Sequence, residues 1–225
     1  MDSFFDSNVS EDSTVEEKIR DLTEKIIRNP EDYFSYKEQA RLLLNNNPNV
    51  GGAIIALESL EKYLNKEPED IEANCLVVRA LRLKGDLDTA LSRAERLKNR
   101  FQNTAMIYEE LGRIQMQKEN YDAALEILSL SYIKYNDERI GRALIQVLVI
   151  LKKNEQALTL CNELLIKKPN DAKAIFKKIT ILCLAGKYKE AIDLGETFID
   201  EYPEESHEIF YRNFKDPMTF EILFA

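Results

Sequence analysis

Apolar residues recur at steps of three and four along most of this chain, as they do at Ile107, Leu111 and Ile114. This spacing places the side chains on one face of a helix and is typical of a helix that packs on a core. The helical stretches alternate with short breaks such as Gly85-Asp86, where glycine interrupts the pattern. The hydrophobic pattern therefore predicts a chain of helical hairpins.

The hairpins follow one another with a nearly constant period. One alanine recurs in each second helix, at intervals of 34, 34, 33 and 34 residues, and the recurring alanines are Ala56, Ala90, Ala124, Ala157 and Ala191. Alanine suits a place where two helices cross closely, because a larger side chain would push the backbones apart. Since a single hairpin cannot bury its apolar stripe alone, the period predicts a stack of hairpins.

A residue suited to cap a helix precedes the first helix of each hairpin. These residues are Asp32, Asp70, Thr104, Asp137 and Asp171. A side-chain oxygen at such a position accepts a hydrogen bond from the free amides of the first turn. We therefore expect the first helices to begin at Tyr33, Ile71, Ala105, Glu138 and Ala172.

The hairpins resemble the tetratricopeptide repeat family. The unit from Ala105 matches the signature positions of the family with Tyr108, Leu111-Gly112, Tyr121 and Ala124. The resemblance implies an all-α, right-handed superhelical solenoid of helix-turn-helix repeats with terminal capping helices. It covers five repeats within 31–205, approximately 33–70, 71–104, 105–137, 138–171 and 172–205. The first repeat departs from the pattern through an insertion at 45–52, which we expect to lengthen its turn.

Both ends of the chain lie outside the repeats. Residues 1–12 are acidic and are expected to be disordered, and 13–30 are expected to form an N-terminal capping helix with a capping box from Ser13 to Glu16. Residues 206–225 are expected to form aromatic-rich C-terminal capping helices. Two interpretations of them stay open, a lid on the last repeat alone or a lid that is also an interface, for example of a homodimer. The candidate interface residues are Phe210, Phe214, Phe220, Leu223 and Phe224.

Composition and charge exclude several classes of function. The formal net charge of -9 disfavours a general nucleic-acid binder. The N-terminus carries acids where a signal peptide needs a basic stretch and an apolar run, and no apolar run is long enough to span a membrane. We therefore expect a cytoplasmic protein without membrane insertion, whose Cys75, Cys161 and Cys183 are reduced core thiols.

The sequence offers little from which to build a catalytic site. His207 is the single histidine, so no histidine pair is available for a metal and no Ser–His or Cys–His array is expected. Neither of the glycine-rich motifs that cradle nucleotide phosphates is present. We therefore predict that the protein is not an enzyme and has no catalytic residue, metal or cofactor.

The family resemblance implies that the first helix of each repeat lines a concave groove with its second, fifth, sixth, ninth, twelfth and thirteenth residues. In this chain those positions hold nine basic residues and four acidic ones, so the expected groove is basic although the whole chain is acidic. The basic residues are the candidate peptide-binding residues Lys37, Arg41, Arg79, Arg82, Arg113, Arg139, Arg142, Lys173 and Lys177. The acidic residues are Glu38, Glu72, Glu109 and Glu110.

Guanidinium and ammonium groups in a cleft bind carboxylates through charge-assisted hydrogen bonds. We therefore predict a non-enzymatic protein–protein interaction module whose groove binds an acidic or carboxylate-bearing peptide of a partner. The acidic segment 1–12 is one candidate occupant of the groove. The competing interpretation of the charges is that they pair with Glu72, Glu109 and Glu110 of neighbouring repeats.

An alternative function is a structural scaffold subunit of a multiprotein complex, which uses convex and terminal surfaces and the aromatic C-terminus. A co-chaperone role is not supported. The residues with which some family members hold the terminal carboxylate of a chaperone peptide are incomplete here, because Arg41 and Leu76 stand where asparagines are expected.

Overall fold

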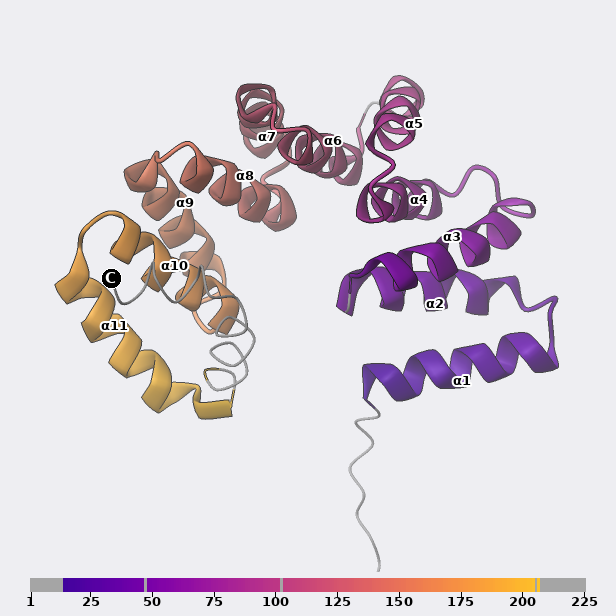
Figure 1. Cartoon of the computed structure of the whole chain (residues 1–225), viewed down its shortest axis with the longest axis horizontal. Helices are drawn as coiled ribbons and strands as arrows, with labels where there is room; N and C mark the ends of the chain where they lie inside the picture. The colour runs from indigo at the N-terminus through magenta and orange to yellow at the C-terminus, as the bar shows by residue number, and fades with distance from the viewer. Residues whose placement is uncertain (1–13, 47, 102, 205, 207–225) are drawn as a thin grey trace, which may run out of the picture. The chain divides into compact units, whose positions relative to one another are not determined.

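The computed structural model describes residues 14–46, 48–101, 103–204 and 206 (Figure 1). These residues form eleven α-helices and no strand. The helices are α1 (Val15–Arg28), α2 (Tyr33–Asn46), α3 (Val50–Leu64), α4 (Ile71–Lys84), α5 (Leu87–Arg100), α6 (Ala105–Gln117), α7 (Tyr121–Tyr135), α8 (Glu138–Ile150), α9 (Asn154–Lys167), α10 (Ala172–Leu184) and α11 (Tyr188–Glu201). The all-α fold of stacked helix pairs predicted from the sequence is confirmed.

Aspartates set the beginnings of several first helices. The side chains of Asp70, Asp137 and Asp171 accept hydrogen bonds from first-turn amides of α4, α8 and α10, and Asp32 accepts one from the amide of Ser35 in α2 at 3.3 Å. Thr104 is the N-cap residue of α6, but its side chain accepts no bond from the helix. For Thr104 the expected capping bond is wrong.

The capping box of α1 is also shifted from its expected place. Thr14 is the N-cap residue, its hydroxyl accepts from the amide of Glu17, and the carboxylate of Glu17 accepts from the amide of Thr14. The predicted box from Ser13 to Glu16 is wrong by one residue, because both pairs fit the same spacing and the spacing alone does not separate them. The helix packs on α2.

The insertion in the first repeat extends helices rather than the turn between them. Helix α2 continues to Asn46, α3 begins at Val50 with Asn49 as its N-cap, and only 47–49 separate the two. The Asn49 side chain accepts from the amide of Gly52 at 2.8 Å. The expected lengthening of the turn is therefore wrong, since most inserted residues take helical positions and a capping bond closes the turn.

The chain divides into two compact units, unit 1 (residues 1–102) with α1 to α5 and unit 2 (residues 103–225) with α6 to α11. Within each unit, helices that are neighbours in sequence pack on one another. First helices also meet the first helix of the next pair, as α2 meets α4 and α6 meets α8. No helix in the described part of the chain is both long and apolar enough to cross a membrane.

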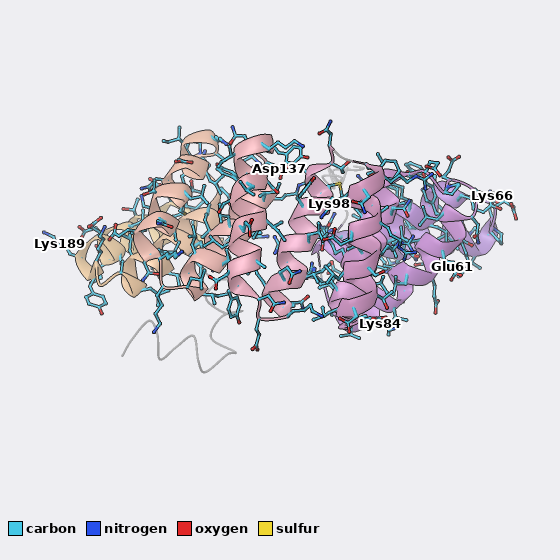
Figure 2. The ribbon with its side chains drawn as sticks, turned by 90° about the horizontal axis from the view of Figure 1, so that it is seen from above. Glu61, Lys66, Lys84, Lys98, Asp137 and Lys189 are labelled. Atoms are coloured by element: carbon cyan, nitrogen blue, oxygen red, sulfur yellow. The ribbon has the colours of Figure 1, made fainter. Side chains whose placement is uncertain are left out.

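Each unit has its own apolar core. In unit 1 Leu44, Leu60 and Leu76 are buried between α2, α3 and α4, and in unit 2 Leu128 and Ile140 are fully buried among the helices from α7 to α10. The recurring alanines are buried in every pair. Many charged side chains project outward from the helix pairs, as Figure 2 shows for the exposed Lys66 and Lys189.

Gly112 of α6 lies directly against Leu128 of α7. A Cβ atom placed on Gly112 would lie 2.4 Å from Cδ2 of Leu128, which is fully buried on α7. The glycine of the family signature is thus required by the packing of this pair.

Candidate functional site

The nine candidate peptide-binding residues lie on the first helices of both units. Four are in unit 1, on α2 and α4, and five are in unit 2, on α6, α8 and α10. Some of these residues form ion pairs with acidic neighbours in the same unit, and others do not.

Lys37 is part of a hydrogen-bonded network between α2 and α4. Its Nζ lies 2.8 Å from Oδ2 of Asp70 and 2.8 Å from Oε2 of Glu72, and its side chain is only 14% exposed. The hydroxyl of Tyr63 donates to the same Asp70 oxygen at 2.7 Å. Burial opposes the charge of Lys37, but the hydrogen bonds to Asp70 and Glu72 outweigh it and raise the pKa of the ammonium group. The network therefore joins two repeats and compensates the charge of Lys37.

The same network predicts how stability depends on acid. Burial disfavours the Asp70 carboxylate, but hydrogen bonds from Lys37, the Ala73 amide and Tyr63 outweigh it and lower the pKa of Asp70 below its ordinary 3.8. A lowered folded-state pKa contributes stability that is fully present above the unfolded pKa and is lost as the pH falls through the folded-state pKa.

Asp70→Asn keeps a capping oxygen and removes the charge, so we expect it to cost about 1–2 kcal/mol at neutral pH. The difference from the unmodified protein should begin to shrink as the pH falls through the ordinary pKa of an aspartate, and it should vanish only below the lowered pKa of folded Asp70. Urea unfolding at a series of pH values measures this difference. A constant difference at every pH would contradict the role of the charge.

The other candidates in unit 1 also have partners. Arg41 forms an ion pair with Glu38 on its own helix and approaches Glu72 of the next repeat at 3.8 Å. The Arg79 guanidinium donates to Oδ1 of Asn45 at 2.5 Å. For Lys37 and Arg41, the pairing with Glu72 that the sequence left open as the competing interpretation is the one observed.

Two acids expected in the groove are buried in unit 2. Glu109 and Glu110 are only 3% and 1% exposed. Nε of Arg113 lies 3.0 Å from one oxygen of Glu109, and Nε of Arg139 lies 3.9 Å from the other. Glu109 is thus an internal partner for two of the candidate arginines, and its pairing with Arg139 of the next repeat is the one that the competing interpretation of the charges described.

Arg142 connects α8 to the beginning of α10. Its guanidinium pairs with Glu138 on its own helix and lies 2.5 Å from Oδ2 of Asp171, the N-cap residue of α10. Lys168 also pairs with Glu138, at 2.7 Å. The hydrogen bond from Lys168 and that from Arg142 hold the pKa of Glu138 below its ordinary value.

A cavity of about 200 Å³ lies between α8, α9 and α10. Three candidate residues line it, namely Arg142, Lys173 and Lys177. Gln146 also lines it, and its apolar wall includes Ile145 and Leu164. We call it the lysine cavity after Lys173 and Lys177. Neither of these lysines has an acidic partner among the described residues.

The two lysines of the cavity differ in exposure. Lys173 is exposed, and Lys177 is half-buried. Burial lowers the pKa of Lys177, which means that its charge is less well solvated than that of a surface lysine. The lysine cavity therefore combines an incompletely solvated cation with apolar walls, and this arrangement suits a carboxylate attached to an apolar group.

The sequence identified the cations of the cavity but missed other lining residues. Gln146 is the ninth residue of α8 and so occupies an expected groove position, but an amide carries no charge signal. Cys161 comes from α9, is buried, and its Sγ lies 3.5 Å from the carbonyl oxygen of Ala174. Burial raises the pKa of this thiol. The sequence therefore had no signal that would have placed Cys161 at the site.

Two sets of expected features lie outside the described residues. They are the acidic segment 1–12 and the candidate interface residues Phe210, Phe214, Phe220, Leu223 and Phe224. Of the expected C-terminal capping helices in 206–225, only Ser206 is described, and it is buried with its amide 2.8 Å from the carbonyl oxygen of Tyr202.

Solved structures share this arrangement of helix pairs. A thermophilic TPR protein of Thermus thermophilus, TTC0263, is similar with a TM-score of 0.64 and 18% identity, over 75% of this chain and 90% of that one. The chain has the tetratricopeptide-repeat fold. The family resemblance predicted from the sequence is thus confirmed at the level of the fold, although no protein-family model and no curated protein matches the sequence.

Two further solved structures share this fold. YrrB, a TPR protein with an unusual peptide-binding site, has a TM-score of 0.52 and 19% identity over 84% of this chain and 97% of that one. A human IFIT1 dimer with m7Gppp-AAAA has a TM-score of 0.70 and 14% identity over 85% of this chain and 48% of that one.

Proposed function

We propose that this protein is a non-enzymatic protein-interaction module that binds a carboxylate-bearing peptide segment of a partner at the lysine cavity. The observation that carries the proposal is that Lys173 and Lys177 line one cavity without an acidic partner among the described residues. The tetratricopeptide-repeat fold supports it, since YrrB, which shares the fold, has a peptide-binding site.

Charge and shape select the kind of ligand. An ammonium group donates charge-assisted hydrogen bonds to a carboxylate, and each such bond contributes about 1.5–3 kcal/mol. The Ile145 and Leu164 side chains offer apolar surface to a neighbouring side chain of the peptide. The ligand is therefore an acidic peptide with an apolar residue close to its carboxylate.

The remaining candidate residues have a different role in this proposal. Several of them pair with acids of the protein itself, namely Lys37, Arg41, Arg113, Arg139 and Arg142. We assign them to the alignment of successive repeats, which keeps the first helices in register. Arg142 also lines the lysine cavity, where its guanidinium is paired with Asp171.

Peptide selection followed by fluorescence anisotropy tests the proposal. Peptides enriched from a random library by the full chain should carry an acidic residue, and replacement of that residue by its amide should weaken binding about tenfold. Enrichment of basic or uncharged peptides would contradict the proposal. The same assay with capped oligoadenylate should show no binding, because the chain carries a net charge of -9.

A structural scaffold subunit is a second candidate function, and the surface of α11 favours it. Tyr188, Ile192 and Ile199 are 65%, 59% and 48% exposed and recur at helical spacing on one side of the helix. Exposed apolar stripes of this kind occur at protein interfaces. Ile192→Asp should disrupt assembly if the protein is a scaffold and leave peptide binding unchanged if the lysine cavity is the site.

A further inference from the structure

A second crevice lies in unit 1. It has a volume of about 400 Å³ and is lined by residues of α3, α4 and α5. Leu57, Val77 and Leu81 form apolar parts of its wall, and Glu61 and Arg93 are its charged residues. We call it the α3–α5 crevice.

Unit 2 contains a crevice at the equivalent repeat positions. It is lined by residues of α7, α8 and α9, has a volume of about 410 Å³, and has Leu125, Leu144 and Leu148 in place of Leu57, Val77 and Leu81. The positions correspond by the repeat register. Leu57 and Leu125, for example, each follow a recurring alanine directly.

Arg93 distinguishes the two crevices. It lies three residues after the recurring Ala90, and the same position of the unit 2 crevice holds Leu160. The other repeats have Ser59, Ile127 and Leu194 there. A guanidinium group thus occupies a position that is apolar in three of the five repeats and uncharged in a fourth.

The structure holds Arg93 in a defined orientation. Its Nη2 donates to Oδ1 of Asn74 at 2.9 Å. The amide nitrogen of Asn74 donates to the carbonyl oxygens of Pro68 and Asp70 at 3.0 and 2.9 Å, and Asn74 is only 8% exposed. Because α4 and the loop before it fix the amide of Asn74, the guanidinium is positioned while most of its five N–H groups remain available.

The positive charge of Arg93 is not balanced inside the described part of the protein. Arg93 is half-buried and forms no ion pair with a described residue, and Glu61 lines the same crevice without pairing with it. Burial and the nearby charge of Arg96 lower the pKa of Arg93. A partly desolvated cation without a counter-charge is unfavourable, and a ligand carboxylate would relieve that cost.

We propose that the α3–α5 crevice is a second binding site, independent of the lysine cavity, for a partner segment in which an acidic residue adjoins a large apolar side chain. The carboxylate accepts paired hydrogen bonds from the Arg93 guanidinium. The apolar side chain lies against Leu57, Val77 and Leu81. Two sites on separate helix surfaces would allow the protein to hold two segments at once.

The test uses the full chain and a defined probe, the peptide N-acetyl-Glu-Leu-Phe amide. Residue-resolved amide NMR should show saturable shifts at Thr89, Arg93 and Leu57. The carboxamide counterpart, with glutamine in place of glutamate, should bind about tenfold more weakly. Arg93→Leu should also weaken the glutamate peptide about tenfold at these residues. This variant is expected to fold, because leucine occupies the equivalent position in unit 2.

Arg96→Leu is the matched control. It removes the same charge from the same helix at an exposed position that does not line the crevice, and it should change the affinity less than about twofold. The proposal is overturned if Arg93→Leu leaves the affinity unchanged, or if both variants weaken binding equally. It is also overturned if the peptide produces no saturable shift in the α3–α5 crevice up to about 5 mM, a concentration that detects even very weak binding.

Discussion

Replacement of both Lys173 and Lys177 by methionine is expected to weaken binding of a selected acidic peptide by at least about 100-fold. Each lysine donates a charge-assisted hydrogen bond of about 1.5–3 kcal/mol, and about 1.4 kcal/mol corresponds to a factor of ten in affinity. Methionine retains the length and apolar stem of lysine, so the cavity walls stay in place. Fluorescence anisotropy with the same labelled peptide measures the change.

The control for this variant is Lys189→Met. Lys189 is exposed on α11 and does not line the cavity, but its loss changes the net charge of unit 2 in the same direction. We expect its effect to stay below about twofold, as is usual for a single exposed charge. If the loss of this exposed charge outside the cavity weakened binding as much as the loss of the two cavity lysines, the binding would be non-specific attraction and the assignment would be wrong.

Gly112→Ala is expected to lower the free energy of unfolding by about 2 kcal/mol. Alanine favours a helix over glycine by about 0.5–1 kcal/mol, but here the added Cβ would lie 2.4 Å from Cδ2 of Leu128. Leu128 is fully buried, so a shift of its side chain would disturb the neighbours packed around it. Overpacking of a well-packed core costs about 1–3 kcal/mol, and so close a contact places this site at the upper end.

Gly195→Ala provides the opposite case in the same unit. Gly195 lies within α11, and a Cβ there would meet nothing within 4 Å. The intrinsic preference of alanine should therefore raise stability by about 0.5–1 kcal/mol. Urea unfolding of both variants measures the two effects, and a loss of stability in both would refute the view that contact with Leu128 distinguishes the two glycines.

The helix pattern could be predicted from the sequence because it depends on local signals. Apolar spacing indicated the helices, and aspartate caps indicated where α4, α8 and α10 begin, since a cap bonds to amides only two or three residues away. The capping box of α1 shows the limit of such signals. Thr14–Glu17 and Ser13–Glu16 fit one pattern, and only the folded chain shows which pair forms.

The chemistry of the site was less predictable, because it depends on partners that are distant in sequence. The sequence identified Lys37 and Lys177 as equivalent cations of the first helices. In the fold Asp70, 33 residues away, neutralises Lys37, whereas Lys177 lines a cavity with Cys161 of a second helix. Arg93 was missed for a related reason. It lies on a second helix, and the expected ligand groove included only first helices.

A double-mutant cycle between Lys177 and the acidic residue of a selected peptide tests the central claim most directly. Affinities would be measured for the unmodified pair, for Lys177→Met, for the peptide with its acid replaced by the amide, and for both changes together. If the two groups contact each other, the double change should cost less than the sum of the single changes, with a coupling of about 1–3 kcal/mol. Additive effects, with coupling below about 0.5 kcal/mol, would show that the carboxylate binds elsewhere and would contradict the proposed function.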